Sequence, residues 1–139
     1  GRVHYDELRQ SLKEELPSNV RLVPYIDNMP SLLRQIKLVV GRSGATSLTE
    51  LTALGLPSIL VPSPYVTNNH QEHNAMALVD HGAARMIKQA DLTGASLVET
   101  IQELMADPEN LEKMARSAYE LGIRDASDRL VKVLEEIIK

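Results

Sequence analysis

The sequence predicts an α/β domain built on a doubly wound parallel sheet, with a helical C-terminal tail. Two observations support this fold class. Short apolar runs rich in β-branched residues alternate with longer segments of helical spacing, and the last third of the chain contains helical segments only. Such alternation is typical of parallel strands joined by right-handed crossovers, with helices on both faces of the sheet. With 139 residues, 43% of them hydrophobic, the chain is expected to form part of one compact domain.

Two apolar runs are the clearest candidates for buried strands. Residues 38–40 and residues 58–61 are rich in β-branched side chains and are bounded by glycine or proline. Residues 20–25 are a third candidate, and residues 85–87 are a fourth.

Helical spacing of apolar residues predicts the remaining elements. They span residues 5–15, 30–36, 45–54, 69–80, 95–106, 109–121 and 126–138. In the last of these segments the apolar side chains recur with the period of one helix face, so we expect them to pack on the sheet or on a partner domain. This stripe consists of Leu130, Val133, Leu134, Ile137 and Ile138.

The chain begins almost directly with its first predicted helix. A doubly wound unit would place a strand before that helix, so we expect residues 1–139 to be a partial domain whose first strands are missing. Repeats and low-complexity tracts are absent from the sequence.

Composition excludes several classes of protein. The chain has no cysteine, so it can form neither a disulfide framework nor a thiolate metal site. A formal net charge of −4 and only 3% aromatic residues argue against a groove for nucleic acid. The sequence has no run of about 18 or more apolar residues, so it predicts no membrane-spanning helix, and it has no basic start followed by an apolar stretch that would read as a signal peptide.

A turn of small residues follows the predicted strand 38–40. Residues 41–46 read Gly-Arg-Ser-Gly-Ala-Thr and lead into a helix. Glycines let the backbone approach a ligand closely, and the N–H groups of a helix start attract anions, so a diphosphate would fit here. The alternative is a plain strand-to-helix turn, because neither of the common glycine-rich phosphate-binding patterns is present.

A carboxylate lies one turn further along the same helix. Open α/β sheets bind ligands at the carboxyl ends of their strands, beside such helix starts, and Glu50 is placed to accept two ribose hydroxyls. The alternative is a surface glutamate that the helix dipole favours.

A second polar segment follows the predicted strand 58–61. Two prolines stiffen the loop, and Asn69 and Glu72 have the spacing of a capping box. His70, Gln71 and Asn74 would then share one side of the first helical turns and could bond several sugar hydroxyls, or they could simply face solvent.

Catalytic and metal-binding patterns are not apparent. His70 and His73 are close in sequence, but no further ligand completes a metal site, so none is expected. His4 and His81 have no recognisable partner, and no nucleophile–histidine arrangement is evident.

Three motifs occur in order along the chain. Residues 25–29 read Tyr-Ile-Asp-Asn-Met; residues 41–58 contain the small-residue turn, Glu-Leu, and Ala-Leu-Gly-Leu-Pro-Ser; residues 61–75 start Val-Pro and end Asn-Asn-His-Gln-Glu-His-Asn-Ala. In this order they resemble the MurG family of glycosyltransferases. The likeness continues through residues 82–84 and 91–92 and, more loosely, to the end of the chain.

The resemblance implies the C-terminal, Rossmann-like domain of a two-domain, inverting GT-B glycosyltransferase that needs no metal or other cofactor. In that family the C-terminal domain binds UDP-N-acetylglucosamine, and the N-terminal domain holds the lipid-linked peptidoglycan precursor at the cytoplasmic face of the bacterial membrane. The membrane-facing patch and the candidate base would lie in that N-terminal domain. The chain by itself is therefore expected to show no glycosyl transfer.

The resemblance also implies roles for individual residues. The backbone at Ile26 would read the uracil and Glu50 the ribose hydroxyls, while Ser43, Gly44 and Ala45 would hold the diphosphate and His70, Gln71 and Asn74 the sugar. The family more usually has two glutamines where this chain has His70 and Gln71.

Two other interpretations fit the same pattern. One is a separately encoded donor-binding subunit of a split transferase that builds lipid-linked oligosaccharides. The other is a different UDP-sugar enzyme of the same fold, such as an epimerase or a glycolipid synthase, because function resides in the site rather than in the fold.

Overall fold

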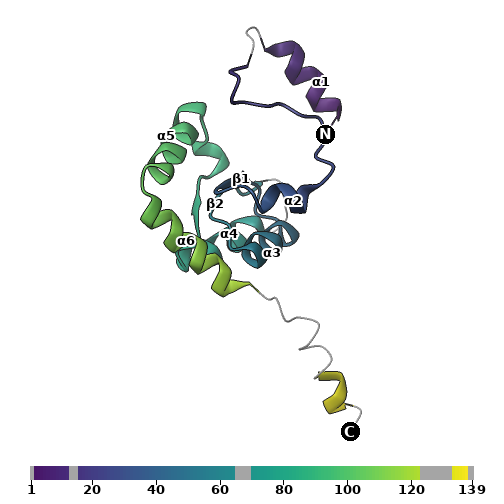
Figure 1. The fold of residues 1–139 in the computed structure, drawn as a ribbon, viewed down its shortest axis with the longest axis vertical. Coiled ribbons are helices and arrows are strands. Elements are labelled where there is room, and N and C mark those ends of the chain that lie inside the picture. The colour runs from purple at the N-terminus through teal and green to yellow at the C-terminus, as the bar shows by residue number, and fades with distance from the viewer. Residues whose placement is uncertain (1, 13–15, 65–69, 123–132, 138–139) are drawn as a thin grey trace. The chain divides into compact units, whose positions relative to one another are not determined.

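The computed structural model describes residues 2–12, 16–64, 70–122 and 133–137. The chain divides into two compact units, Gly1–Gln35 and Ile36–Lys139. Each unit is described by itself (Figure 1).

The first unit contains two helices, α1 (Arg2–Ser11) and α2 (Met29–Leu33). The side chain of Asn28 caps α2 by accepting a hydrogen bond from the Ser31 N–H at 3.3 Å. α1 begins at Arg2 and ends at Ser11, so it overlaps the predicted range 5–15 but starts and ends earlier; residues 13–15 lie outside the described part of the chain. α2 begins and ends earlier than its predicted range of 30–36.

The prediction of a strand at residues 20–25 is wrong. This segment is irregular in the structure, and Val20, Val23 and Tyr25 are exposed. A β-branched run becomes a strand only where a neighbour pairs with its backbone, and Pro24 lacks the N–H that such pairing needs.

The second unit contains a parallel sheet of three strands in the order β1-β2-β3. They are β1 (Val39–Gly41), β2 (Ser58–Leu60) and β3 (Ala84–Met86), and Ile59 pairs with Val40 on one side and with Arg85 on the other. Each strand lies within one residue of its predicted range. The sheet confirms the α/β fold class.

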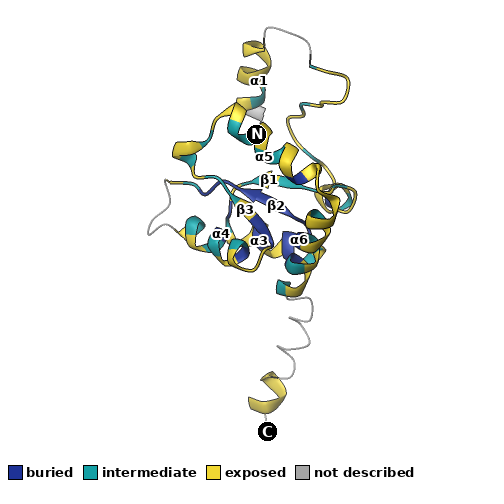
Figure 2. Ribbon diagram, turned by 90° about the vertical axis from the view of Figure 1, so that its left-hand side faces the viewer, coloured by how far each residue is buried: buried dark blue, intermediate teal, exposed yellow. Residues whose placement is uncertain are grey.

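Two crossover helices connect the strands: α3 (Ala45–Leu54) joins β1 to β2, and α4 (His70–Asp80) joins β2 to β3. Because the strands follow in spatial order and crossovers are right-handed, both helices cover the same face of the sheet, as Figure 2 shows. α3 ends at Gly55, whose φ of 66° lies in the left-handed region that glycine adopts without strain.

Two further helices, α5 (Gly94–Met105) and α6 (Pro108–Leu121), follow the sheet in the chain. Thr93 and Ser96 form a reciprocal capping box at the start of α5, and the short 3-10 helix η2 (Gln89–Asp91) precedes it. The core packs Ile59, at the centre of the sheet, against Leu104 of α5 and Met114 of α6. α5 therefore covers the face opposite α3 and α4.

The last predicted helix is described only at residues 133–137, which are helical. Val133, Leu134 and Ile137 are exposed there, so these members of the predicted stripe do not pack on the sheet. Leu130 and Ile138 lie outside the described residues. Within the described parts of the chain, no helix has both the length and the apolar character needed to cross a membrane.

Candidate functional site

The turn after β1 brings a helix start to the carboxyl edge of the sheet. Gly44 is the N-cap of α3, and its carbonyl accepts the Leu48 N–H at 3.1 Å. A glycine at the N-cap has no side chain to satisfy the first amides of the helix, and Ala45, the first helical residue, is exposed. The exposed N–H groups at such a terminus can bind an anion.

Two hydrogen bonds join this turn to the start of α4. The fully buried Ser43 donates from its Oγ to the Gln71 carbonyl at 2.6 Å, and Asn74 donates from its Nδ2 to the Ser43 carbonyl at 3.2 Å. The structure thus brings together three residues that the sequence had assigned to one site from two separate motifs. We call this pair of bonds the Ser43 interlock.

The side chain of Gln71 is half-buried and joins a further segment to the site. Its Oε1 accepts the Ser63 N–H at 2.8 Å, which fixes the loop after β2 against α4. Its Nε2 lies 3.9 Å from the point that a Cβ on Gly44 would occupy. Because residue 44 is glycine, the space between this amide and the turn stays open.

The two remaining predicted residues of this unit are exposed. Glu50 lies in the second turn of α3, and His70 is the first residue of α4. Neither side chain makes a hydrogen bond or an ion pair with another described residue. Both can therefore interact with a ligand. Asn69, the predicted cap of α4, lies outside the described residues.

Ile26 belongs to the first unit. It is half-buried in the irregular segment that precedes α2. Its predicted contact with uracil is untested and stays a prediction.

Sequence reasoning missed a pair of side chains at this edge of the sheet. Arg42 donates from its Nη1 to the Val61 carbonyl at 3.3 Å and to the Gln89 Oε1 at 2.6 Å. Arg42 stands inside the turn motif, but Gln89 lies 47 positions later, so sequence spacing gave no sign of the pair.

A second unpredicted pair lies nearby, where Lys88 Nζ approaches Glu72 Oε1 at 3.5 Å. Both residues line a cavity of about 170 Å³ together with the loop 62–64. In the described parts of the chain, no cluster of three or more histidine or acidic side chains could hold a metal ion.

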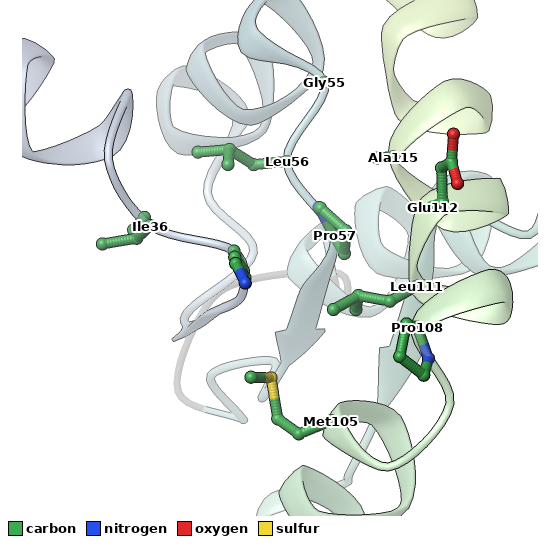
Figure 3. Close-up of a pocket in the computed structure, with 10 residues that line it drawn as sticks. Ile36, Gly55, Leu56, Pro57, Met105, Pro108, Leu111, Glu112 and Ala115 are labelled. Carbon is green, nitrogen blue, oxygen red and sulfur yellow. The ribbon is translucent and has the colours of Figure 1, made fainter.

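A larger, mainly apolar cavity of about 340 Å³ lies elsewhere (Figure 3). It opens at the amino ends of the strands, because Lys37 precedes β1 and Pro57 precedes β2. Met105, Pro108, Leu111 and Ala115 form the wall from α5 and α6. None of the predicted site residues lines it, and ligands of open α/β sheets bind at the opposite, carboxyl edge.

Comparison with known proteins gives matches along nearly the whole chain. Residues 1–130 match the glycosyltransferase family 28 C-terminal domain. A protein of Lactiplantibacillus plantarum named UDP-N-acetylglucosamine--N-acetylmuramyl-(pentapeptide) pyrophosphoryl-undecaprenol N-acetylglucosamine transferase is 53% identical over all of this chain and 39% of its own length. A protein of the same name from Latilactobacillus sakei is 54% identical over 99% of this chain and 38% of its own length. The chain thus spans about two fifths of these relatives.

Solved structures give the same fold. MurG of Acinetobacter baumannii superposes with a TM-score of 0.81 and 29% identity, over 94% of this chain and 38% of that protein. The glycosyltransferase VinC superposes with a TM-score of 0.69 over 94% of this chain and 32% of the VinC chain. The two sequences are 24% identical, so this likeness shows a shared fold and nothing about function.

Proposed function

We propose that this chain, which belongs to the family of glycosyltransferase family 28 C-terminal domains, is the donor-binding part of a transferase of the MurG type. The full-length enzyme would transfer N-acetylglucosamine from UDP-N-acetylglucosamine to undecaprenyl-pyrophosphoryl-N-acetylmuramyl-pentapeptide. In this reaction the acceptor hydroxyl attacks the anomeric carbon, and UDP leaves with the electron pair of the broken bond. The proton of the hydroxyl passes to a base that we expect outside this chain.

The observation that carries this proposal is the Ser43 interlock. It holds the turn before α3 and the start of α4 together at the carboxyl edge of the sheet. A diphosphate at Ser43, Gly44 and Ala45 would then lie beside the amide of Gln71, where an attached sugar would follow. A single UDP-sugar could therefore contact both the turn before α3 and the start of α4.

The remaining roles follow from exposure and chemistry. Glu50 offers a carboxylate with no partner among the described residues, which suits two ribose hydroxyls. His70, Gln71 and Asn74 offer polar groups to the sugar, and the backbone at Ile26 would read the uracil. No metal ion is needed in this scheme, because helix-start amides meet the diphosphate charge.

The acceptor and the membrane would be contacted through the other domain of the enzyme. We place the enzyme peripherally at the cytoplasmic face of the bacterial membrane, where its lipid-linked acceptor would be presented. Holding donor and acceptor in one cleft supplies much of the rate of such a transfer.

The direct test is release of UDP by the full-length protein that carries this chain. We expect release from UDP-N-acetylglucosamine only when the lipid-linked acceptor is added, and much slower release from UDP-N-acetylgalactosamine. A coupled assay for UDP measures both. If release did not depend on the acceptor, the proposed function would be wrong.

The sugar role of Gln71 has a sharper test, because its amide has two ends with different tasks. Gln71→Glu keeps an oxygen for the Ser63 N–H but removes the Nε2 donor that faces the open space beside Gly44. Losing one hydrogen bond to the sugar should narrow the preference for UDP-N-acetylglucosamine over UDP-N-acetylgalactosamine about two- to tenfold. The ratio of kcat/KM for the two donors measures it.

This ratio is the informative quantity, because the added negative charge weakens both donors equally. Gln102→Glu, on the exposed surface of α5, is the matched control and should leave the ratio unchanged. If Gln71→Glu weakened both donors and kept the ratio, this segment would support the fold and would not read the sugar.

A further inference from the structure

We propose that Arg42 is a positioning residue, which sets the geometry of the diphosphate turn through its bond to Gln89 and does not itself bind the phosphates. The proposal rests on the proposed function, because it concerns how the same donor site is kept in shape.

The position of the guanidinium supports this role. Arg42 directly follows β1, Val61 directly follows β2, and Gln89 begins the 3-10 helix that follows β3. A single nitrogen, Nη1, donates to the Val61 carbonyl at 3.3 Å and to the Gln89 Oε1 at 2.6 Å. One side chain therefore ties together the segments that leave all three strands.

These bonds lie just beyond the backbone pairing of the sheet. The Val61 N–H donates to the Gly41 carbonyl at 2.9 Å, and the Ile87 N–H donates to the Leu60 carbonyl at 3.0 Å. Past these points the three segments diverge into separate turns, and Arg42 adds a side-chain connection there. Arginine suits this task, because the two N–H bonds of Nη1 lie in the rigid plane of the guanidinium and can each reach one acceptor.

The connection acts on the donor site through the next residue. Ser43 is fully buried and bonded to Gln71, so its position fixes the turn against α4. Arg42 holds the entry to the same turn. A turn fixed at both points presents the amides of Gly44 and Ala45 in one orientation, which lowers the entropy lost when an anion binds.

Substitution of Gln89 separates positioning from direct contact, because it removes the anchor of Arg42 and leaves the charge in place. In the full-length protein, titration calorimetry with UDP should show a Kd about three- to tenfold higher for Gln89→Ala. Gln89→Glu, which keeps an oxygen acceptor for Arg42, should raise the Kd less than Gln89→Ala does, although it adds a negative charge. Arg42→Lys should weaken UDP by a similar factor, and the double variant Arg42→Lys, Gln89→Ala should be no weaker than Arg42→Lys alone.

Other results would overturn the proposal. If Arg42→Lys weakened UDP while Gln89→Ala did not, or if their effects multiplied, Arg42 would contact the phosphates directly. If both variants lowered the melting temperature and left the Kd unchanged, the pair would only stabilise the fold. If the unsubstituted protein failed to bind UDP, the proposed function itself would be wrong, and this proposal with it.

Discussion

Replacing Glu50 with alanine is expected to raise the KM for UDP-N-acetylglucosamine about ten- to a hundredfold in the full-length enzyme. The carboxylate is exposed in the second turn of α3 and has no bonding partner among the described residues. A charged acceptor paired with ribose hydroxyls contributes about 1.5–3 kcal/mol, which corresponds to that range. Initial rates at varied donor concentration measure the change.

The matched control for this prediction is Glu99→Ala. Glu99 is also an exposed glutamate on a helix, but it belongs to α5 and not to the two connections that form the candidate site. Its replacement should leave the KM unchanged, and neither substitution should alter the melting temperature appreciably, because exposed side chains contribute little to stability. An unchanged KM for Glu50→Ala would mean that Glu50 is a surface residue favoured only by its helix.

The largest effect on stability is expected at the centre of the sheet. Ile59 is fully buried between β1 and β3 and packs against Leu104 and Met114. Ile59→Ala removes buried carbon atoms and leaves a cavity that the surrounding elements can only partly fill. The free energy of unfolding should fall by about 2–5 kcal/mol, and urea denaturation measures it.

Val40→Ala is the control in the neighbouring strand. Val40 pairs with Ile59 in the sheet register, yet 42% of its surface is exposed. Replacing Val40 should lower the free energy of unfolding by less than about 1 kcal/mol, because the atoms removed bury less apolar surface than those of Ile59 do. Equal losses for the two variants would contradict a core that is centred on Ile59.

Local signals predicted much of the fold. The strands β1 and β2 were recognisable because apolar β-branched runs end at glycine or proline, and α3 spans its predicted range of 45–54. The failure at residues 20–25 has a physical cause. That run has strand composition, but pairing depends on a distant partner, which a local pattern does not record, and Pro24 within the run removes one backbone donor.

At the candidate site, too, local sequence could predict some features and not others. The sequence could place Ser43, Gln71 and Asn74 near one another, because each stands at a strand-to-helix connection at the carboxyl edge of a parallel sheet, and their roles toward a ligand stay predictions. The bonds between them could not be predicted, since they join segments about 30 residues apart. The pair of Arg42 and Gln89 escaped detection for the same reason.

The Ser43 interlock has a consequence for how the specificity of this site can change. The Ser43 hydroxyl bonds the main-chain carbonyl of Gln71, and every amino acid has that carbonyl. Substitution at position 71 can therefore alter what the side chain offers to a sugar while this bond between turn and helix persists. The side chain of Gln71 also accepts the Ser63 N–H, so a substitution at position 71 should keep an acceptor there, whereas the Ser43 hydroxyl is needed for the bond to α4 itself. Variants with new donor preferences should accordingly be sought at positions 70 and 71, with Ser43 left unchanged.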